Sequence, residues 1–185
     1  MVDLIAQAIE GGVQMVQLRD KKSGDQEFLE LASKVHQITR KKKIPLIIND
    51  RVDVARLVDA EGVHLGEDDL PLKGARKILG SKKIIGASAS DIKTAKIKEK
   101  EGADYIGLGP VFETGSKEIK KPLGVEILKE AKRSLKIPVF PIGGINLSNL
   151  DQIISTGTKR VAVISAIFMS EDVRRATREL LRRLK

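Results

Sequence analysis

The 185-residue chain has no cysteine and no tryptophan, and aromatic residues make up only 3% of it. The absence of cysteine excludes disulfides, thiolate metal sites and cysteine nucleophiles. So few aromatic rings provide little surface for stacking nucleic-acid bases. No apolar run approaches the ~20 residues of a membrane-spanning helix, and the N-terminus lacks the basic and apolar regions of a secretory signal. We therefore expect a cytoplasmic chain without a membrane partner.

Charged residues are abundant, and 34 Lys and Arg against 25 Asp and Glu give a net charge of +9. Such a charge raises the alternative of a basic nucleic-acid-binding protein. However, the run Arg40–Lys43 ends an expected helix, where cations complement the helix dipole. Five arginines on the expected C-terminal helix accompany apolar residues at helical spacing. We therefore expect a solvated basic surface and no nucleic-acid partner. The abundance of Lys, Arg and Glu is also typical of proteins from hot environments.

Seven short apolar or β-branched runs alternate with amphipathic segments along the whole chain. The runs are almost continuously apolar, as in strands buried on both faces of a parallel sheet. These expected strands are Met15–Leu18, Pro45–Asn49, Gly62–Leu65, Lys83–Ala87, Tyr105–Gly109, Pro138–Ile142 and Arg160–Ser165. The expected helices are Val2–Glu10, Gln26–Lys43, Val52–Ala60, Leu72–Leu79, Ile92–Glu101, Val125–Leu135, Leu147–Thr156 and Asp172–Leu184. No linker interrupts the pattern, so we predict one α/β domain over residues 1–185.

The order of these elements favours a TIM (β/α)8-type barrel with parallel strands. Polar residues follow nearly every expected strand, and the active site of such a barrel is built at the carboxyl ends of its strands. An open doubly wound sheet is less favoured, because the three spaced glycines of its nucleotide-binding turn are missing. A complete barrel has eight strands, each followed by a helix. With seven strands and eight helices, the chain is expected to lack the N-terminal first strand.

The segment Gly107–Lys117 leaves a buried run through glycines and a proline into a loop with two hydroxyls and a lysine. Glycines allow the backbone to approach an anion closely. Thr114 and Ser116 can donate hydrogen bonds, and Lys117 brings a point charge suited to phosphate. Two further candidate phosphate loops also follow strands, at Ile142–Ile145 and Val163–Ala166. We therefore predict an enzyme that acts on phosphorylated substrates.

Two aspartates are candidate metal ligands. Asp50 and Asp69 each follow an expected strand, and adjacent loops could direct both carboxylates at one point. Mg²⁺ prefers a few carboxylates together with phosphate oxygens and waters. Loop solvation or helix N-capping is the alternative role for both aspartates.

Six motifs, in order along nearly the whole chain, together resemble the thiamine phosphate synthase family. They are Gln17–Lys21, Ile48–Asp50, Gly62–Gly66 with Asp69, Phe112–Lys117, Gly143–Ile145 and Val163–Ala166. The resemblance implies a (β/α)8 barrel and a Mg²⁺-dependent transferase of thiamine biosynthesis. The implied reaction couples 4-amino-2-methyl-5-hydroxymethylpyrimidine diphosphate with a thiazole phosphate, giving thiamine phosphate and diphosphate.

The resemblance also implies roles for individual residues. The metal ligands would be Asp50 and Asp69, rather than the adjacent Asp68, and the catalytic residues Ser88 and Lys117. The implied substrate-binding residues fall into three groups. The diphosphate would be held by Arg19, Lys21, Asn49 and Lys117, the pyrimidine by Gln17 and Ser88, and the thiazole phosphate by Thr114, Ser116, Gly144, Ile164 and Ser165. Plainer alternatives remain: surface charge for the lysines, a polar plug in the barrel for Gln17, and a cap or turn for Ser88.

The chain departs from the family pattern at two places. Many relatives carry histidine where this chain has Ser90, which weakens the alternative of a thiazole tautomerase. His36 and His64 are expected to be structural and not to replace that histidine. Because the first strand is expected to be missing, a further alternative is a catalytically impaired paralogue that binds phosphorylated thiazole. We expect a truncated barrel whose gap is covered by a partner chain, as in a homo-oligomer, or by rearranged N-terminal residues.

Overall fold

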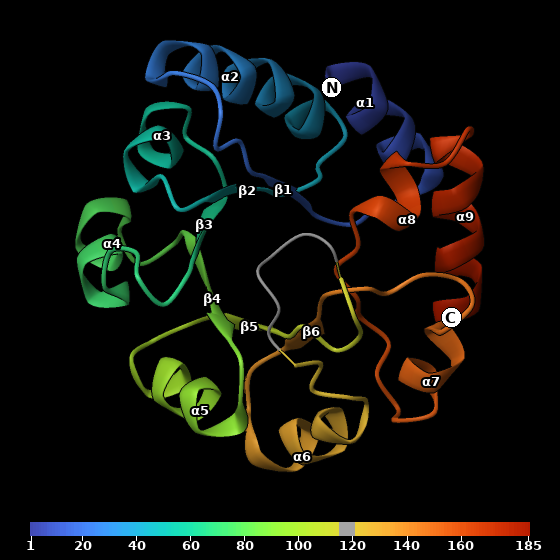
Figure 1. The fold of residues 1–185 in the computed structure, drawn as a ribbon. Coiled ribbons are helices and arrows are strands. Elements are labelled where there is room, and N and C mark those ends of the chain that lie inside the picture. The colour runs from blue at the N-terminus through green and yellow to red at the C-terminus, as the bar shows by residue number, and fades with distance from the viewer. Residues whose placement is uncertain (115–120) are drawn as a thin grey trace.

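A computed structural model describes residues 1–114 and 121–185 of the chain. Six strands form one parallel sheet in chain order (Figure 1): β1 Val16–Leu18, β2 Leu46–Asn49, β3 Gly62–Leu65, β4 Ile84–Ala89, β5 Tyr105–Leu108 and β6 Val139–Pro141. The helices within these residues are α1 Val2–Gly11, α2 Asp25–Lys41, α3 Val52–Leu57, α4 Leu72–Leu79, α5 Ile92–Lys100, α6 Glu126–Ser134, α7 Leu150–Ile154, α8 Ser165–Phe168 and α9 Val173–Leu184. None of the described helices combines the length and apolar character needed to span a membrane.

The sheet curves into a half-barrel, with the helices arranged around its outside (Figure 1). All residues of β2, β3 and β5 are buried, because the barrel interior covers one face of the sheet and the helices cover the other. The expected parallel α/β architecture is therefore confirmed, and the fold is TIM-barrel-like.

The predicted count of seven strands and eight helices is not confirmed, since the described residues form six strands and nine helices. The expected seventh strand, Arg160–Ser165, is reduced to one bridge between Ile142 and Ala162. Pairing stops there because Gly143 follows with a φ of 98°, which turns the partner segment out of the extended conformation. Beyond the bridge, Ser165 already begins α8, a helix that the sequence pattern did not predict.

Helices α1 and α9 lie side by side (Figure 1), and Arg174 of α9 forms an ion pair with Glu10 of α1. Within the described residues β1 pairs only with β2. Helices α1 and α9 thus continue the helical layer beyond β1, on the side where no described strand pairs with it.

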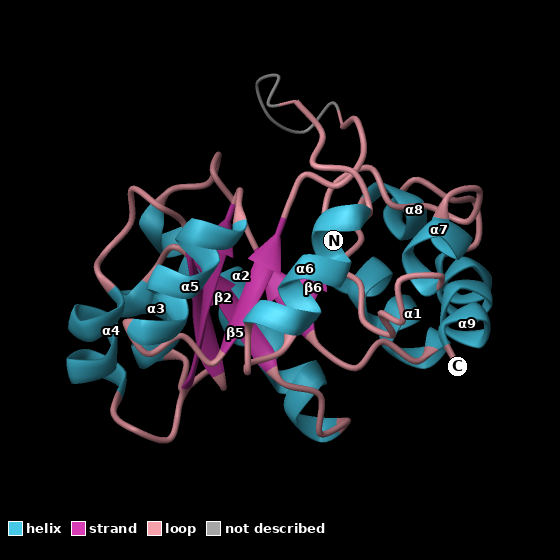
Figure 2. Ribbon diagram, turned by 90° about the horizontal axis from the view of Figure 1, so that it is seen from below, coloured by secondary structure: helices cyan, strands magenta, loops and turns pink. Residues whose placement is uncertain are grey.

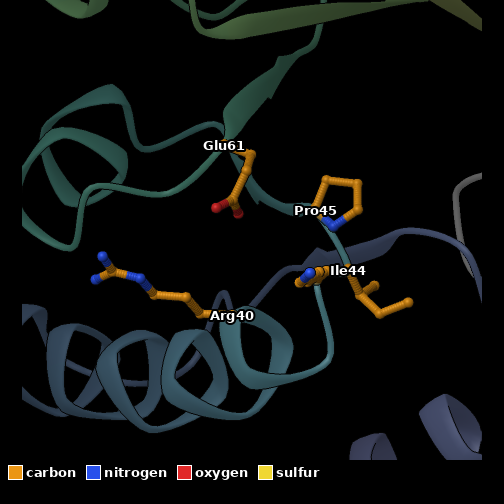
Figure 3. A pocket seen from close by; sticks show the side chains of 5 residues that line it. Arg40, Ile44, Pro45 and Glu61 are labelled. Carbon is orange, nitrogen blue, oxygen red and sulfur yellow. The ribbon is translucent and has the colours of Figure 1, made fainter.

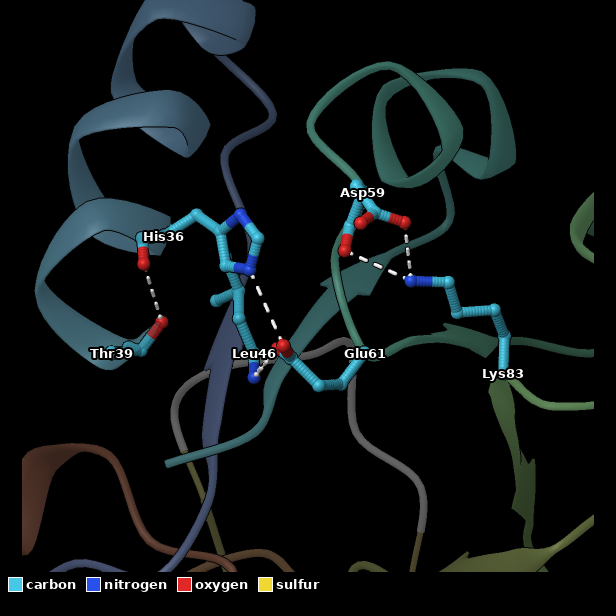
Figure 4. Close-up of polar contacts among 6 residues, drawn as sticks. All are labelled: His36, Thr39, Leu46, Asp59, Glu61 and Lys83. Atoms are coloured by element: carbon cyan, nitrogen blue, oxygen red, sulfur yellow. Dashed lines mark hydrogen bonds and ion pairs between the residues drawn. The ribbon is translucent and has the colours of Figure 1, made fainter. Parts of the chain in front are cut away.

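A polar cluster connects helices and strands at the amino ends of the strands (Figure 4). Glu61, just before β3, accepts a hydrogen bond from the Leu46 backbone N–H at 2.8 Å. Its other oxygen lies 3.3 Å from Nε2 of His36 on α2. Nearby, Lys83 forms a 2.6 Å ion pair with Asp59. One glutamate therefore joins α2, β2 and β3.

A shallow pocket lies beside the same glutamate (Figure 3). It is lined by Arg40, Lys43, Ile44, Pro45 and Glu61. Because these residues flank the amino ends of β2 and β3, the pocket lies at the end of the sheet that serves stability in barrels of this type.

We expect Glu61→Ala to lower the free energy of unfolding by about 1–3 kcal/mol, because it leaves the Leu46 N–H without its carboxylate acceptor. Urea unfolding followed by circular dichroism measures the effect. Glu130→Ala, at an exposed position of α6, is the matched control and should change stability by less than about 0.5 kcal/mol. Equal losses in both variants would contradict a bridging role for Glu61.

Candidate active site

The loops after the first three strands bring charged residues to one edge of the sheet. Arg19 and Lys21 follow β1, Asp50 follows β2, and Asp69 lies four residues after β3. Parallel neighbouring strands end at the same edge, toward which the strand arrows point in Figure 2. Both cations act electrostatically on Asp50 and favour its ionised form. The structure therefore brings these four side chains near one another, and their role as a functional site stays a prediction.

Asp50 and Asp69 share a side-chain hydrogen bond, so their carboxyl groups are in direct contact. Burial, together with the hydrogen bond and charge of Asp69, raises the pKa of Asp50 to about 6, while Arg19 and Lys21 oppose that rise. Asp69 is fixed by a 2.6 Å hydrogen bond from the Gly66 N–H. Asp50 is fixed through its own N–H, which donates to the His64 carbonyl at 2.8 Å.

The aspartate pair suits a hard divalent cation. Two carboxylates in contact repel each other when both are ionised, and a cation between them removes that repulsion. Within the described residues, no group of three or more His, Cys, Asp or Glu side chains could hold a metal by itself. A site with only two carboxylates fits Mg²⁺, which usually takes its remaining oxygen ligands from substrate phosphates and water. The adjacent Asp68 is exposed.

A hydrogen-bonded network in the barrel interior connects two more of the expected site residues. Nε2 of His64 lies 2.9 Å from Ser88 Oγ, and its Nδ1 lies 2.9 Å from the Tyr105 hydroxyl. The Gln17 side chain hydrogen-bonds to Tyr105 in turn. His64 lies on a strand, as expected, and it contacts Ser88, a predicted site residue to which the sequence analysis did not connect it. Buried Asn49 is its neighbour in the register of β2 and β3.

The candidate phosphate loops after β5 and β6 pack against each other. The Phe112 N–H donates to the Gly143 carbonyl at 3.1 Å. Gly144 has a φ of 65°, and a Cβ there would lie 2.2 Å from the Glu113 carbonyl oxygen. Thr114 is the next residue after Glu113. The expected residues Ser116 and Lys117 lie outside the described residues.

The third candidate loop begins at the same edge of the sheet. Ile164 and Ser165 come two and three residues after Ala162, which is bridged to Ile142 just before the two glycines. Both residues are exposed, at the start of α8. The predicted site residues in the described part of the chain therefore lie on the strands, in the loops that follow them or at the start of α8.

This arrangement defines a TIM-barrel-like α/β protein with an acidic pair, cations and candidate phosphate loops at the carboxyl ends of its strands. The chain matches the family model for thiamine monophosphate synthase over residues 1–167. It is 44% identical over 181 residues to the thiamine-phosphate synthase of Clostridium novyi, covering 97% of this chain and 89% of the relative. The synthase of Halalkalibacterium halodurans is 49% identical over 172 residues, covering 92% and 82%. The chain therefore belongs to the thiamine monophosphate synthase family.

Solved structures agree with this assignment. Thiamine phosphate pyrophosphorylase from Pyrococcus furiosus superposes with a TM-score of 0.90 at 42% identity, covering 99% of this chain and 88% of that one. A 3-hexulose-6-phosphate synthase superposes with a TM-score of 0.71 at 14% identity, covering 99% and 92%. The second likeness shows the shared fold alone.

Proposed function

We propose that this chain is a thiamine-phosphate synthase, a transferase that couples the pyrimidine diphosphate to the thiazole phosphate and releases diphosphate. The observation that carries the proposal is the contact between Asp50 and Asp69 beside Arg19 and Lys21, in a chain of this family. A diphosphate leaving group needs compensation for several negative charges. The four side chains supply two cations and a cation-binding pair at one point.

Asp50 and Asp69 would hold Mg²⁺, which supplies positive charge to the leaving diphosphate when bound. Arg19 binds the diphosphate in a fork of hydrogen bonds, and Lys21 adds a compact charge. Asn49, at the end of β2, donates its amide to the same group. Lys117, outside the described residues, is proposed as a further cation for the diphosphate.

The two rings are held on either side of the bond that forms. We place the pyrimidine against Gln17 and Ser88, which the interior network connects. The thiazole phosphate binds at the loops after the later strands, through Thr114, Ser116, Gly144, Ile164 and Ser165. The bond between the pyrimidine methylene carbon and the diphosphate oxygen breaks, and a bond to the thiazole nitrogen forms. Placement of the two reactants and stabilisation of the leaving group are then the main contributions of the protein.

A fluorescence assay of thiamine phosphate after oxidation tests this function. We expect product only when both substrates and Mg²⁺ are present, and none when any of the three is omitted. Release of diphosphate in equal amount, measured by a coupled enzyme assay, excludes simple hydrolysis of the pyrimidine diphosphate. Isomerisation of the thiazole without coupling would instead support the tautomerase alternative, and binding of thiazole phosphate without any reaction would support an impaired paralogue.

A further inference from the structure

In the loop that follows β6, the carbonyl oxygen of Gly144 accepts hydrogen bonds from two side chains. Nδ2 of Asn149 donates to it at 2.8 Å, and Nδ2 of Asn146 donates to it at 3.2 Å. Asn149 lies directly before α7, which belongs to the outer layer of helices (Figure 1). The Gly144 carbonyl is therefore held on the side of the loop that faces Asn149.

The donor and acceptor atoms of both side-chain amides are fixed by backbone groups. Oδ1 of Asn149 accepts from the Asn146 N–H at 2.9 Å, and Oδ1 of Asn146 accepts from the Ser148 N–H at 2.9 Å. A backbone N–H can only donate and a backbone carbonyl can only accept. Exchanging the oxygen and nitrogen of either amide would place donor against donor and acceptor against acceptor, so each amide has one possible orientation.

The same contacts orient the N–H of the peptide group that contains the Gly144 carbonyl. The peptide between Gly144 and Ile145 is trans, and in a planar trans peptide the C=O and the N–H point in opposite directions. Because the carbonyl points toward Asn149, the Ile145 N–H points away from it. A reversal of this peptide would break both hydrogen bonds to the side-chain amides, and each has a cost.

The preceding peptide is held in a similar way from the loop after β5. The Gly143 carbonyl accepts from the Phe112 N–H at 3.1 Å, so the Gly144 N–H points away from that loop. Neither the Gly144 N–H nor the Ile145 N–H donates a hydrogen bond to any residue of the described ranges, 1–114 and 121–185. Successive backbone N–H groups at a turn are a common means of binding an anion. Here both remain available while the carbonyls of their peptides are bound elsewhere.

We propose that Asn149 is a positioning residue, which holds the Gly144 carbonyl so that the Ile145 N–H donates to the thiazole phosphate beside the Gly144 N–H. Asn146 supports the same carbonyl over a longer distance. Without these amides the peptide is free to reverse, and its carbonyl oxygen, which can only accept, would then face the phosphate. This inference rests on the proposed synthase function, because it concerns the loop that would bind the phosphate in that reaction.

Binding of inorganic phosphate tests the direction of the Ile145 N–H without any turnover. Proton–nitrogen NMR of the full-length chain follows each backbone amide as phosphate is added. We expect the amide protons of Gly144 and Ile145 to move downfield with one dissociation constant, because both donate to the same anion. In Asn149→Asp the response of the Ile145 amide should be much smaller. An Ile145 amide that does not respond in the native chain would overturn the proposal.

Asn149→Asp also separates the donor of this side chain from its acceptor in the coupling assay. One carboxylate oxygen still accepts from the Asn146 N–H, but neither oxygen can donate to the Gly144 carbonyl. We expect the KM for thiazole phosphate to rise about tenfold, with kcat and the KM for the pyrimidine diphosphate changed less than about threefold. Equal rises of KM for both substrates would show a general loosening of the fold and overturn the positioning role.

Ser148→Asp is the matched control for the charge that Asn149→Asp adds. Ser148 is exposed in the same loop, and its substitution places a carboxylate next to Asn149 without removing either amide. We expect the KM for thiazole phosphate to change less than about threefold, since the Gly144 carbonyl keeps both donors. A rise as large as in Asn149→Asp would assign the effect to charge alone and contradict the proposal.

The two kinds of measurement keep this inference separate from the synthase function. A native chain that makes no thiamine phosphate but shows the Ile145 response to phosphate loses the synthase function and keeps the oriented phosphate loop. A native chain that is active but has an unresponsive Ile145 amide loses only the role of Asn149.

Discussion

Replacing either aspartate of the acidic pair is expected to lower kcat/KM for the coupling reaction by at least about 10³-fold. Asp50→Asn and Asp69→Asn each remove one of the two carboxylates that would hold the cation, and Arg19 and Lys21 alone cannot balance a departing diphosphate. The asparagine substitutions keep the size of each side chain. Asn is also suited to the φ of 64° at position 50. Steady-state assays over a range of Mg²⁺ concentrations measure the loss, and high Mg²⁺ should restore little of it.

The same Asp50→Asn change is expected to stabilise the metal-free protein at pH 7–8. The pKa of Asp50 is raised to about 6 in the folded chain, from 3.8 in the unfolded chain. The folded state therefore binds the proton more tightly, and the favourable contribution of this group is lost as the pH rises from about 4 through about 6. Asparagine removes the penalty of the buried charge. Because Asp50 is partly exposed, we expect a gain of about 1 kcal/mol, seen in urea unfolding with a chelator present.

The exposed neighbour Asp68 provides a matched control for both effects. Asp68→Asn removes a carboxylate from the same loop but not from the pair, so activity and stability should stay near the native values. The stability difference between Asp50→Asn and the native chain should also disappear below about pH 4. A Mg²⁺-dependent enzyme that survives Asp50→Asn, or loses as much activity through Asp68→Asn, would contradict the assignment of the pair.

The periodic pattern of the sequence was sufficient to predict those strands and helices whose local signal agrees with the pairing they make in the fold. Gly62–Leu65 and Leu72–Leu79 were predicted with their observed ends, because continuous burial and helical spacing are both local signals. The segment Arg160–Ser165 carries the same β-branched signal, but it forms only one bridge. Its pairing depends on the conformation of a partner segment, which turns away at Gly143. No window of residues around Ala162 contains that information.

The candidate site shows the same contrast between features that follow from local sequence and features that depend on how the strands pair. The aspartates and cations were predicted together because parallel strands bring their carboxyl ends to one edge, whatever the exact register. The contact of His64 with Ser88 and Tyr105 depends on the register of three strands and on the two glycines between them. In the sequence, His64 is one polar residue between Val63 and Leu65, which is also the pattern of a buried structural histidine. The glycines at positions 86 and 107 were the available signal, and they become informative only once the strands are aligned.

The glycine at position 144 is expected to be essential for binding the thiazole phosphate. Gly144→Ala would place a Cβ 2.2 Å from the Glu113 carbonyl oxygen and 2.8 Å from the Phe112 Cβ. Because one of these contacts is backbone, the loop that carries Thr114 has to move. We expect the KM for thiazole phosphate to rise at least about tenfold and the free energy of unfolding to fall by about 2–4 kcal/mol. The KM for the pyrimidine diphosphate should change less than about threefold, because its proposed residues lie on the earlier strands.

Gly124→Ala separates the steric contact from backbone strain. Gly124 has a φ of 70°, close to the 65° of Gly144, but a Cβ there meets nothing within 4 Å. Both variants therefore carry the cost of about 1 kcal/mol for an alanine in the left-handed region, and only Gly144→Ala adds the collision. Substrate titrations and urea unfolding of the two variants, compared side by side, isolate that collision. Equal effects on stability and an unchanged KM for thiazole phosphate in both would mean that the contact between the β5 and β6 loops does not shape the phosphate site. A selective rise of KM in Gly144→Ala would instead show that the two loops bind the thiazole phosphate as one unit.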